Sequence, residues 1–164
     1  MSNLSRILVH GGALSLLSSL YLLAVLYYNP RLFLQDYPDA VQSRVPPKTA
    51  QERRQSLLVG VPFLLLLVAA PALSTLALKN QAGGATFWQL FLNAFGVVFS
   101  FNLVDWLLLD WLIICTLKPR FLIIPGTEGM DSYENYAYHF RGFLIGTLLS
   151  LVAGLVIAAV VALL

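Results

Sequence analysis

Four long apolar stretches constrain the fold of this chain more than any other feature of its sequence. They cover residues 7–28, 56–78, 87–117 and 142–164. An α-helix rises about 1.5 Å per residue, so about 20 residues cross a hydrocarbon core of ~30 Å. Each stretch is therefore long enough to span a bilayer. We predict an all-α integral membrane protein in which residues 1–164 form one domain, a bundle of four transmembrane helices.

The composition agrees with a lipid environment and excludes several function classes. Hydrophobic residues make up 59% of the chain and charged residues only 11%, against about 25% charged residues in soluble domains. The net charge of +2 is small and gives no basic face, so we expect no nucleic-acid partner. The expected partners are the lipid bilayer and further copies of the chain or other membrane subunits. We predict no cofactor and no metal, since no metal-ligand spacing is present and His10 and His139 fall at opposite ends of the bundle.

Basic residues are distributed unequally between the two ends of the predicted spans. One side carries eight, in the loops between the first and second spans and between the third and fourth: Arg31, Arg44, Lys48, Arg53, Arg54, Lys118, Arg120 and Arg141. The other side carries only Arg6 and Lys79. Positive loops stay in the cytoplasm. We therefore predict that the two longer loops (1–2 and 3–4) are cytoplasmic, that both termini lie outside, and that the protein resides in the cell (inner or plasma) membrane.

Local signals mark where the helices begin and end. Asn29-Pro30 ends the first helix, because proline is a poor continuation of a helix. Thr49 and Glu52 have the spacing of a capping box, which predicts a helix start before the second span. Gly83-Gly84 predicts a tight turn, and Thr86 is a suitable cap for the third helix.

Small residues recur at every fourth position of the last stretch and at the same spacing in the first. The candidate packing residues are Gly142, Gly146, Ser150, Gly154 and Ala158, and Gly11, Ser15 and Ser19. Apolar surface gains little from leaving lipid, so close backbone approach at small residues drives helix association in membranes. We predict that the first and fourth helices pack through these faces, either against each other or against a neighbouring subunit.

The third stretch is unusually polar for a span and supplies a candidate intramembrane site, Asn102, Asp105 and Asp110. An ionisable group in the bilayer centre costs at least ~2.5–3.5 kcal/mol, so it faces protein or water and is often functional. At ~100° per residue, Asp105 and Asp110 lie about 140° apart, which argues against a carboxyl pair. Two separate polar arcs predict that this helix is central in the bundle.

Structural roles remain open for both carboxyl groups. Asp110 is also suited to an interfacial ion pair with Arg120 or Arg141, and Asp105 to a buried hydrogen bond with Asn102 or a neighbouring serine. A second candidate site lies at the cytoplasmic interface and consists of Tyr138, His139 and Arg141, with Asp110 as a further neighbour. The alternative interpretation of this second group is an interfacial belt of side chains at the headgroups.

Three functions follow, and the sequence favours the first. The first function is that of an assembling or accessory subunit of a membrane complex, which binds its neighbours through its small-residue helix faces. The second function is a proton-coupled or cation transporter, or a channel-like oligomer, that uses Asp105 and Asn102. The third is a membrane enzyme that acts on a lipid or small molecule at the cytoplasmic face. The sequence contains no catalytic motif, which favours the first over the third.

Overall fold

The computed structural model describes residues 2–81 and 84–164. Over these residues the regular secondary structure is all helical: 83% of residues lie in helices and there is no strand. Its long helices are α1 (Asn3–Tyr28), α3 (Ala50–Lys79), α4 (Phe87–Val104), which continues directly into the π-helix η2 (Asp105–Leu117), and α5 (Tyr136–Leu163). Four helices, with α4 and η2 taken as one, are long and apolar enough to cross a membrane, as predicted. Of the predicted turn at Gly83-Gly84, Gly83 lies outside the described residues.

Helices α3 and α4 begin where the capping signals predicted, and α1, α3 and α5 begin before their apolar stretches. The backbone N–H of Thr49 donates to Glu52 Oε2 (2.7 Å), and that of Glu52 donates to Thr49 Oγ1 (3.1 Å), which confirms the capping box of α3. Thr86 forms the same arrangement with Gln89 at the start of α4. Helix α5 starts at residue 136 rather than 142 because its first turn is polar, and hydropathy does not detect a polar helical turn.

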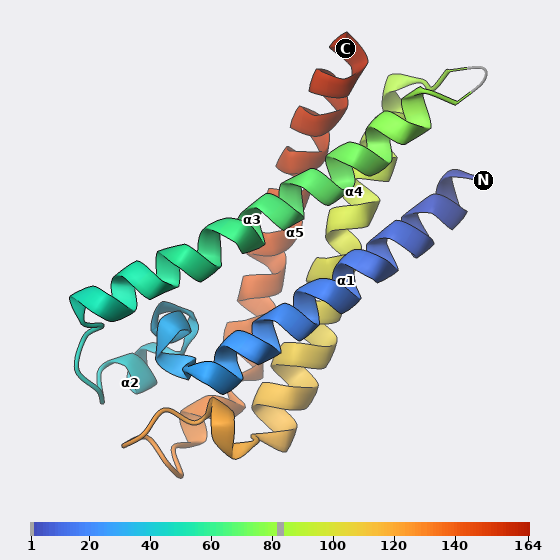
Figure 1. Cartoon of the computed structure of the whole chain (residues 1–164). Coiled ribbons are helices and arrows are strands. Elements are labelled where there is room, and N and C mark those ends of the chain that lie inside the picture. The colour runs from blue at the N-terminus through green and yellow to red at the C-terminus, as the bar shows by residue number, and fades with distance from the viewer. Residues whose placement is uncertain (1, 82–83) are drawn as a thin grey trace.

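Helix α4 lies at the centre of the bundle, with α1, α3 and α5 packed against it (Figure 1). A Cβ atom on Gly11 would come within 2.7 Å of Ser100 Cβ, and one on Gly154 within 2.9 Å of Phe95 Cβ. Within one chain, both small-residue faces therefore meet α4. The prediction that the first and fourth helices partner each other in the monomer is wrong, and their packing against another subunit remains a prediction.

The predicted packing residues differ in their surroundings. The buried ones are Gly11, Ser15, Ser19, Ser150, Gly154 and Ala158. Gly146 is half-buried against the side-chain amide of Asn102. Gly142 is exposed, and a Cβ there would meet nothing within 4 Å. Its predicted packing role is therefore incorrect within one chain. The reason is that a stripe with a four-residue period drifts by about 40° per step around a 3.6-residue helix, so its first member turns away from α4.

The two longer loops fold together into a cap, residues 29–48 and 118–135, at the end of the bundle opposite to both termini (Figure 1). The cap contains the short helices η1 (Pro30–Asp36), α2 (Asp39–Gln42), η3 (Arg120–Leu122) and η4 (Asp131–Glu134). Its core is a buried apolar cluster: Leu34, Tyr37, Val41, Ile124 and Tyr133. The Tyr37 hydroxyl donates to the Leu122 carbonyl oxygen (2.9 Å), which links the two loops. The cap therefore covers the end of η2 and the start of α5.

Candidate functional site

The π-helical geometry of η2 places side chains five positions apart on one face. The rings of Trp106 and Trp111 have centroids only 4.6 Å apart. The Thr116 hydroxyl donates to the carbonyl oxygen of Trp111, again five residues earlier (2.7 Å). In a π-helix, backbone hydrogen bonds join residues five apart. Asp105 and Asp110 therefore share a face, and the predicted separation of about 140° is incorrect because it assumed the α-helical rotation of ~100° per residue.

Asp110 contacts His139, and this contact joins the two candidate sites. His139 Nδ1 and Asp110 Oδ1 lie 2.9 Å apart, within ion-pair distance. The Asp110 side chain is 19% exposed and that of His139 only 7%, so the pair is largely shielded from solvent. Within the described part of the chain, the buried His139 Nε2 has no hydrogen-bond partner. The His139 imidazole thus has a partner at Nδ1, and its Nε2 can form a hydrogen bond with a further group.

Two indole nitrogens of η2, the helix that carries Asp110, also lack a hydrogen-bond partner in the described structure. Trp106 Nε1 and Trp111 Nε1 are buried and have no acceptor among residues 2–81 and 84–164. Trp106 packs against Phe140, the residue after His139, with ring centroids 5.4 Å apart. Most buried polar atoms in proteins have a hydrogen-bond partner. Three ring nitrogens of η2 and α5 that lack a partner among the described residues therefore mark a region suited to proton exchange or to a polar molecule.

The cap contributes Asp36 to the same region. The Tyr138 hydroxyl donates to the carbonyl oxygen of Tyr37 (3.2 Å), so the start of α5 lies against the end of η1. The Asp36 side chain reaches the surface, yet its carboxyl group is partly desolvated. Desolvation raises the pKa of Asp36 above its ordinary value; Lys48 opposes this rise, and the nearby charge of Asp110 adds to it. Asp36 therefore reaches the surface and lies close enough to Asp110 for their charges to interact. No motif in the sequence distinguishes Asp36 from the other acidic residues of the loop, so its role could not be predicted.

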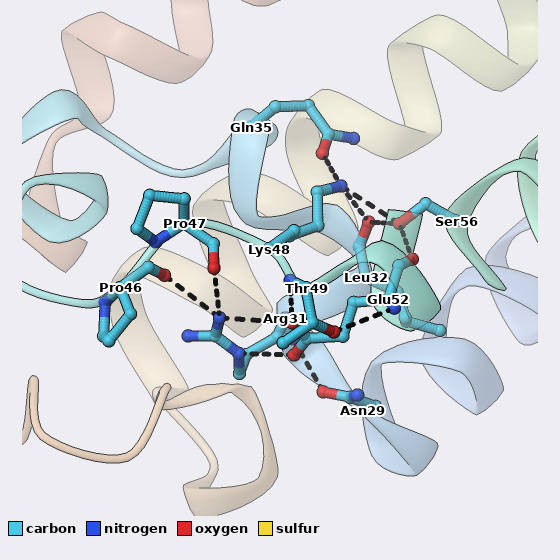
Figure 2. Close-up of polar contacts among 10 residues, drawn as sticks. All are labelled: Asn29, Arg31, Leu32, Gln35, Pro46, Pro47, Lys48, Thr49, Glu52 and Ser56. Carbon is cyan, nitrogen blue, oxygen red and sulfur yellow. Dashed lines mark hydrogen bonds and ion pairs between the residues drawn. The ribbon is translucent and has the colours of Figure 1, made fainter. Parts of the chain in front are cut away.

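A polar network fixes η1 to the start of α3 (Figure 2), and Asp36 is the last residue of η1. Arg31 Nε donates to Glu52 Oε1 (2.6 Å), and Arg31 Nη2 donates to the Pro46 carbonyl oxygen (3.0 Å). Lys48 Nζ donates to the Leu32 carbonyl oxygen (2.8 Å) and to neutral side chains of the same network. An arginine forked onto a carboxylate and onto carbonyl oxygens holds the backbone in a defined place.

The remaining candidate residues lie apart from the Asp110–His139 pair. Asn102 Nδ2 donates to the Phe143 carbonyl oxygen and to Thr147 Oγ1, each over 3.1 Å, and so ties α4 to α5. In the described part of the chain Asn102 makes no hydrogen bond to Asp105, so the predicted bond between these two residues is incorrect. Arg141 is exposed, and Asp110 pairs with His139 rather than with an arginine.

Neither metal-binding geometry nor known proteins supply a function for this site. Among residues 2–81 and 84–164, no group of three or more His, Cys, Asp or Glu side chains could hold a metal ion. Comparisons with known protein families, with characterised proteins and with solved structures find no match to this chain. The site must therefore be interpreted from its chemistry.

Proposed function

We propose that the protein handles protons, and that it passes them between the surface of the cap and Asp105 inside the membrane. Four titratable side chains form the series: Asp36 at the surface, the pair of Asp110 and His139, and Asp105 one π-helical turn further along. The observation that carries the proposal is the buried His139 ring: its Nδ1 lies 2.9 Å from Asp110 Oδ1, and its Nε2 has no hydrogen-bond partner among residues 2–81 and 84–164.

The chemistry of these groups suits proton transfer. Histidine exchanges protons near neutral pH, and a hydrogen bond at one ring nitrogen fixes which proton the other can take or give. Carboxyl groups within membrane spans commonly serve in proton relays. Helical segments with π geometry often occur at functional sites, and here that geometry aligns the two carboxyl groups of η2.

The proposal includes the sidedness and an assembly. We propose that both termini lie outside the cell membrane and that the cap is cytoplasmic, which makes Asp36 the entry for cytoplasmic protons. Beyond Asp105 the series stops, because Asn102 is bonded to α5 and the Ser100 hydroxyl donates to its own helix at Gly96 (2.7 Å). A further subunit, either another copy or a different membrane protein, is then needed to receive the proton. The protein would thus act as an accessory subunit of a proton-coupled complex.

Infrared spectroscopy of the purified protein in nanodiscs tests the proposed series directly. The difference between wild type and Asp105→Asn identifies the C=O band of the Asp105 carboxyl group. Transfer into D2O then gives the rate at which its proton exchanges with solvent. We expect His139→Gln to slow this exchange at least tenfold, since a positioned acid–base group contributes roughly 10²–10⁴-fold to a proton transfer.

Asp39→Asn is the matched control, since Asp39 is an exposed carboxyl of the same cap and contacts none of the four groups through its side chain in the described structure. Its exchange rate should equal that of wild type. The proposal is wrong if Asp105 gives no protonated band, or if the exchange rate is the same with and without His139.

A further inference from the structure

A second polar cluster lies inside the bundle, toward the end where the two termini are found. It joins three helices: His10 of α1, Ser74 of α3 and Asn93 of α4. His10 Nδ1 and Ser74 Oγ are 2.7 Å apart, and Asn93 Nδ2 donates to Ser74 Oγ over 3.0 Å. Asn93 is completely buried and Ser74 is 3% exposed, whereas His10 is half-buried. The cluster is independent of the Asp110–His139 pair and plays no part in the proposed proton series.

One tautomer of His10, with its proton on Nε2, gives every group in this cluster a complementary partner at the Ser74 hydroxyl. Ser74 Oγ already accepts from Asn93, and within the described residues its own hydrogen has one acceptor, His10 Nδ1. Neutral imidazole carries its hydrogen on one nitrogen and accepts at the other. His10 Nδ1 is then the acceptor and Nε2–H the donor. In the described structure this N–H has no protein acceptor.

A hollow of about 300 Å³ opens beside this donor, between α1 and α3. His10 and Ser74 line it, and the other lining side chains are alanines and leucines, so apart from His10 none of the lining residues is acidic or basic. His10 lies seven residues into α1, about 10 Å from its start, and therefore within the hydrocarbon region of the proposed span. An N–H group without an acceptor is costly in such surroundings.

We propose that this hollow binds a lipid-soluble molecule with a ring carbonyl group, of the size of a substituted benzoquinone. Its carbonyl oxygen accepts from His10 Nε2–H, and its apolar tail lies along the leucines of α1 and α3. The volume is that of a small ligand pocket, with many apolar groups and few polar ones. A charged ligand finds no counter-charge in the lining, and the ester carbonyls of phospholipids lie at the membrane surface rather than at this depth.

Decylubiquinone, a quinone with a short apolar tail, is the probe that tests this site. Its binding to the full-length protein in nanodiscs is measured above its partition into empty nanodiscs. We expect saturable binding with one site per chain and at least a tenfold loss of affinity in His10→Phe. Infrared spectra of the ¹³C-labelled carbonyl should show a hydrogen-bonded band that His10→Phe abolishes.

A pair of tryptophan substitutions tests the same site without changing His10. Leu17 and Leu16 are similarly exposed on α1, at 56% and 61%, but only Leu17 lines the hollow. Leu17→Trp should fill the hollow and weaken binding at least tenfold, while Leu16→Trp should bind like wild type. The proposal is overturned if binding never saturates above empty nanodiscs, or if Leu17→Trp and His10→Phe both retain wild-type affinity.

Discussion

Trp106 and Trp111 meet edge to face, with ring centroids 4.6 Å apart, although they lie five positions apart in the chain. In an α-helix these positions point in different directions, so the contact depends on the π geometry of η2. The same geometry brings Asp105 onto the face of Asp110, and Asp110 onto His139 of α5. One change in helix type thus gathers side chains that an α-helix would separate.

The pairing of Asp110 with His139 predicts a strongly coupled pair of substitutions. His139→Phe keeps a ring at this position but leaves the Asp110 carboxyl group without its partner, which should cost about 1–3 kcal/mol of unfolding free energy. Adding Asp110→Leu should restore a large part of the loss, because removing both partners costs less than removing one. Unfolding in mixed detergent micelles measures both. Equal stability of the single and double variants would argue against this coupling.

Two glycines of α5 form a matched pair for the packing against α4. A methyl group on Gly154 would lie 3.1 Å from the backbone nitrogen of Phe95, which cannot move aside easily, whereas one on Gly142 would meet open space. Gly154→Ala should therefore destabilise the protein by about 1–3 kcal/mol, as overpacking does.

Gly142→Ala should leave stability unchanged or raise it slightly, because alanine is the better helix former. The measurement is again unfolding in mixed micelles. Equal losses at Gly142 and Gly154 would mean that both glycines are packed, Gly142 then against another copy of the chain.

Much of the fold could be predicted because its signals are local. Span length, the Thr49–Glu52 capping box and the cap at Thr86 each depend on residues close in sequence, and the structure confirms them. The helix that packs against a small-residue face, in contrast, could not be predicted. The stripe in α5 indicates that some backbone comes close, but nothing in its spacing distinguishes α1 from α4.

Only part of the candidate site could be predicted, because the rest depends on helix type and on contacts between distant residues. Asp110 and His139 both fall at the same end of neighbouring spans, so the sequence could place them near each other. The π-helix could not be foreseen, because every angular argument from sequence assumes one rotation per residue. Asp36 comes close only through the fold of the cap, which depends on contacts such as that between Tyr37 and the Leu122 carbonyl oxygen, 85 residues further along the chain.

The raised pKa of Asp36 predicts how the stability of the cap changes with pH. Burial favours the neutral form of this carboxyl group, so the folded cap binds its proton more tightly than the unfolded chain does. The contribution is fully present below the ordinary pKa of 3.8 and is lost as pH rises through the higher value of the folded state. Asp36→Asn should therefore stabilise the cap at pH 7 and have little effect at acid pH.

Hydrogen–deuterium exchange of residues 30–42, corrected for the intrinsic effect of pH, measures this change. The control is Asp39→Asn, an exposed carboxyl on the neighbouring helix α2. Stabilisation by Asp36→Asn that is equal at both pH values would show that the effect comes from side-chain shape rather than from charge.

Sidedness can be tested with single cysteines at the two ends of α3. The buried Cys115 is first replaced by serine; then Ser43→Cys introduces a thiol in the cap and Asn80→Cys one at the opposite end of α3, both at exposed positions. Because α3 lies between them, a membrane-impermeant maleimide added to intact cells should reach only one of the two. The distribution of lysine and arginine predicts that this is Asn80→Cys, and that inverted vesicles reverse the pattern. Labelling of Ser43→Cys alone in intact cells would place the cap outside and Asp36 away from cytoplasmic protons, while labelling of both would mean that α3 does not cross the membrane.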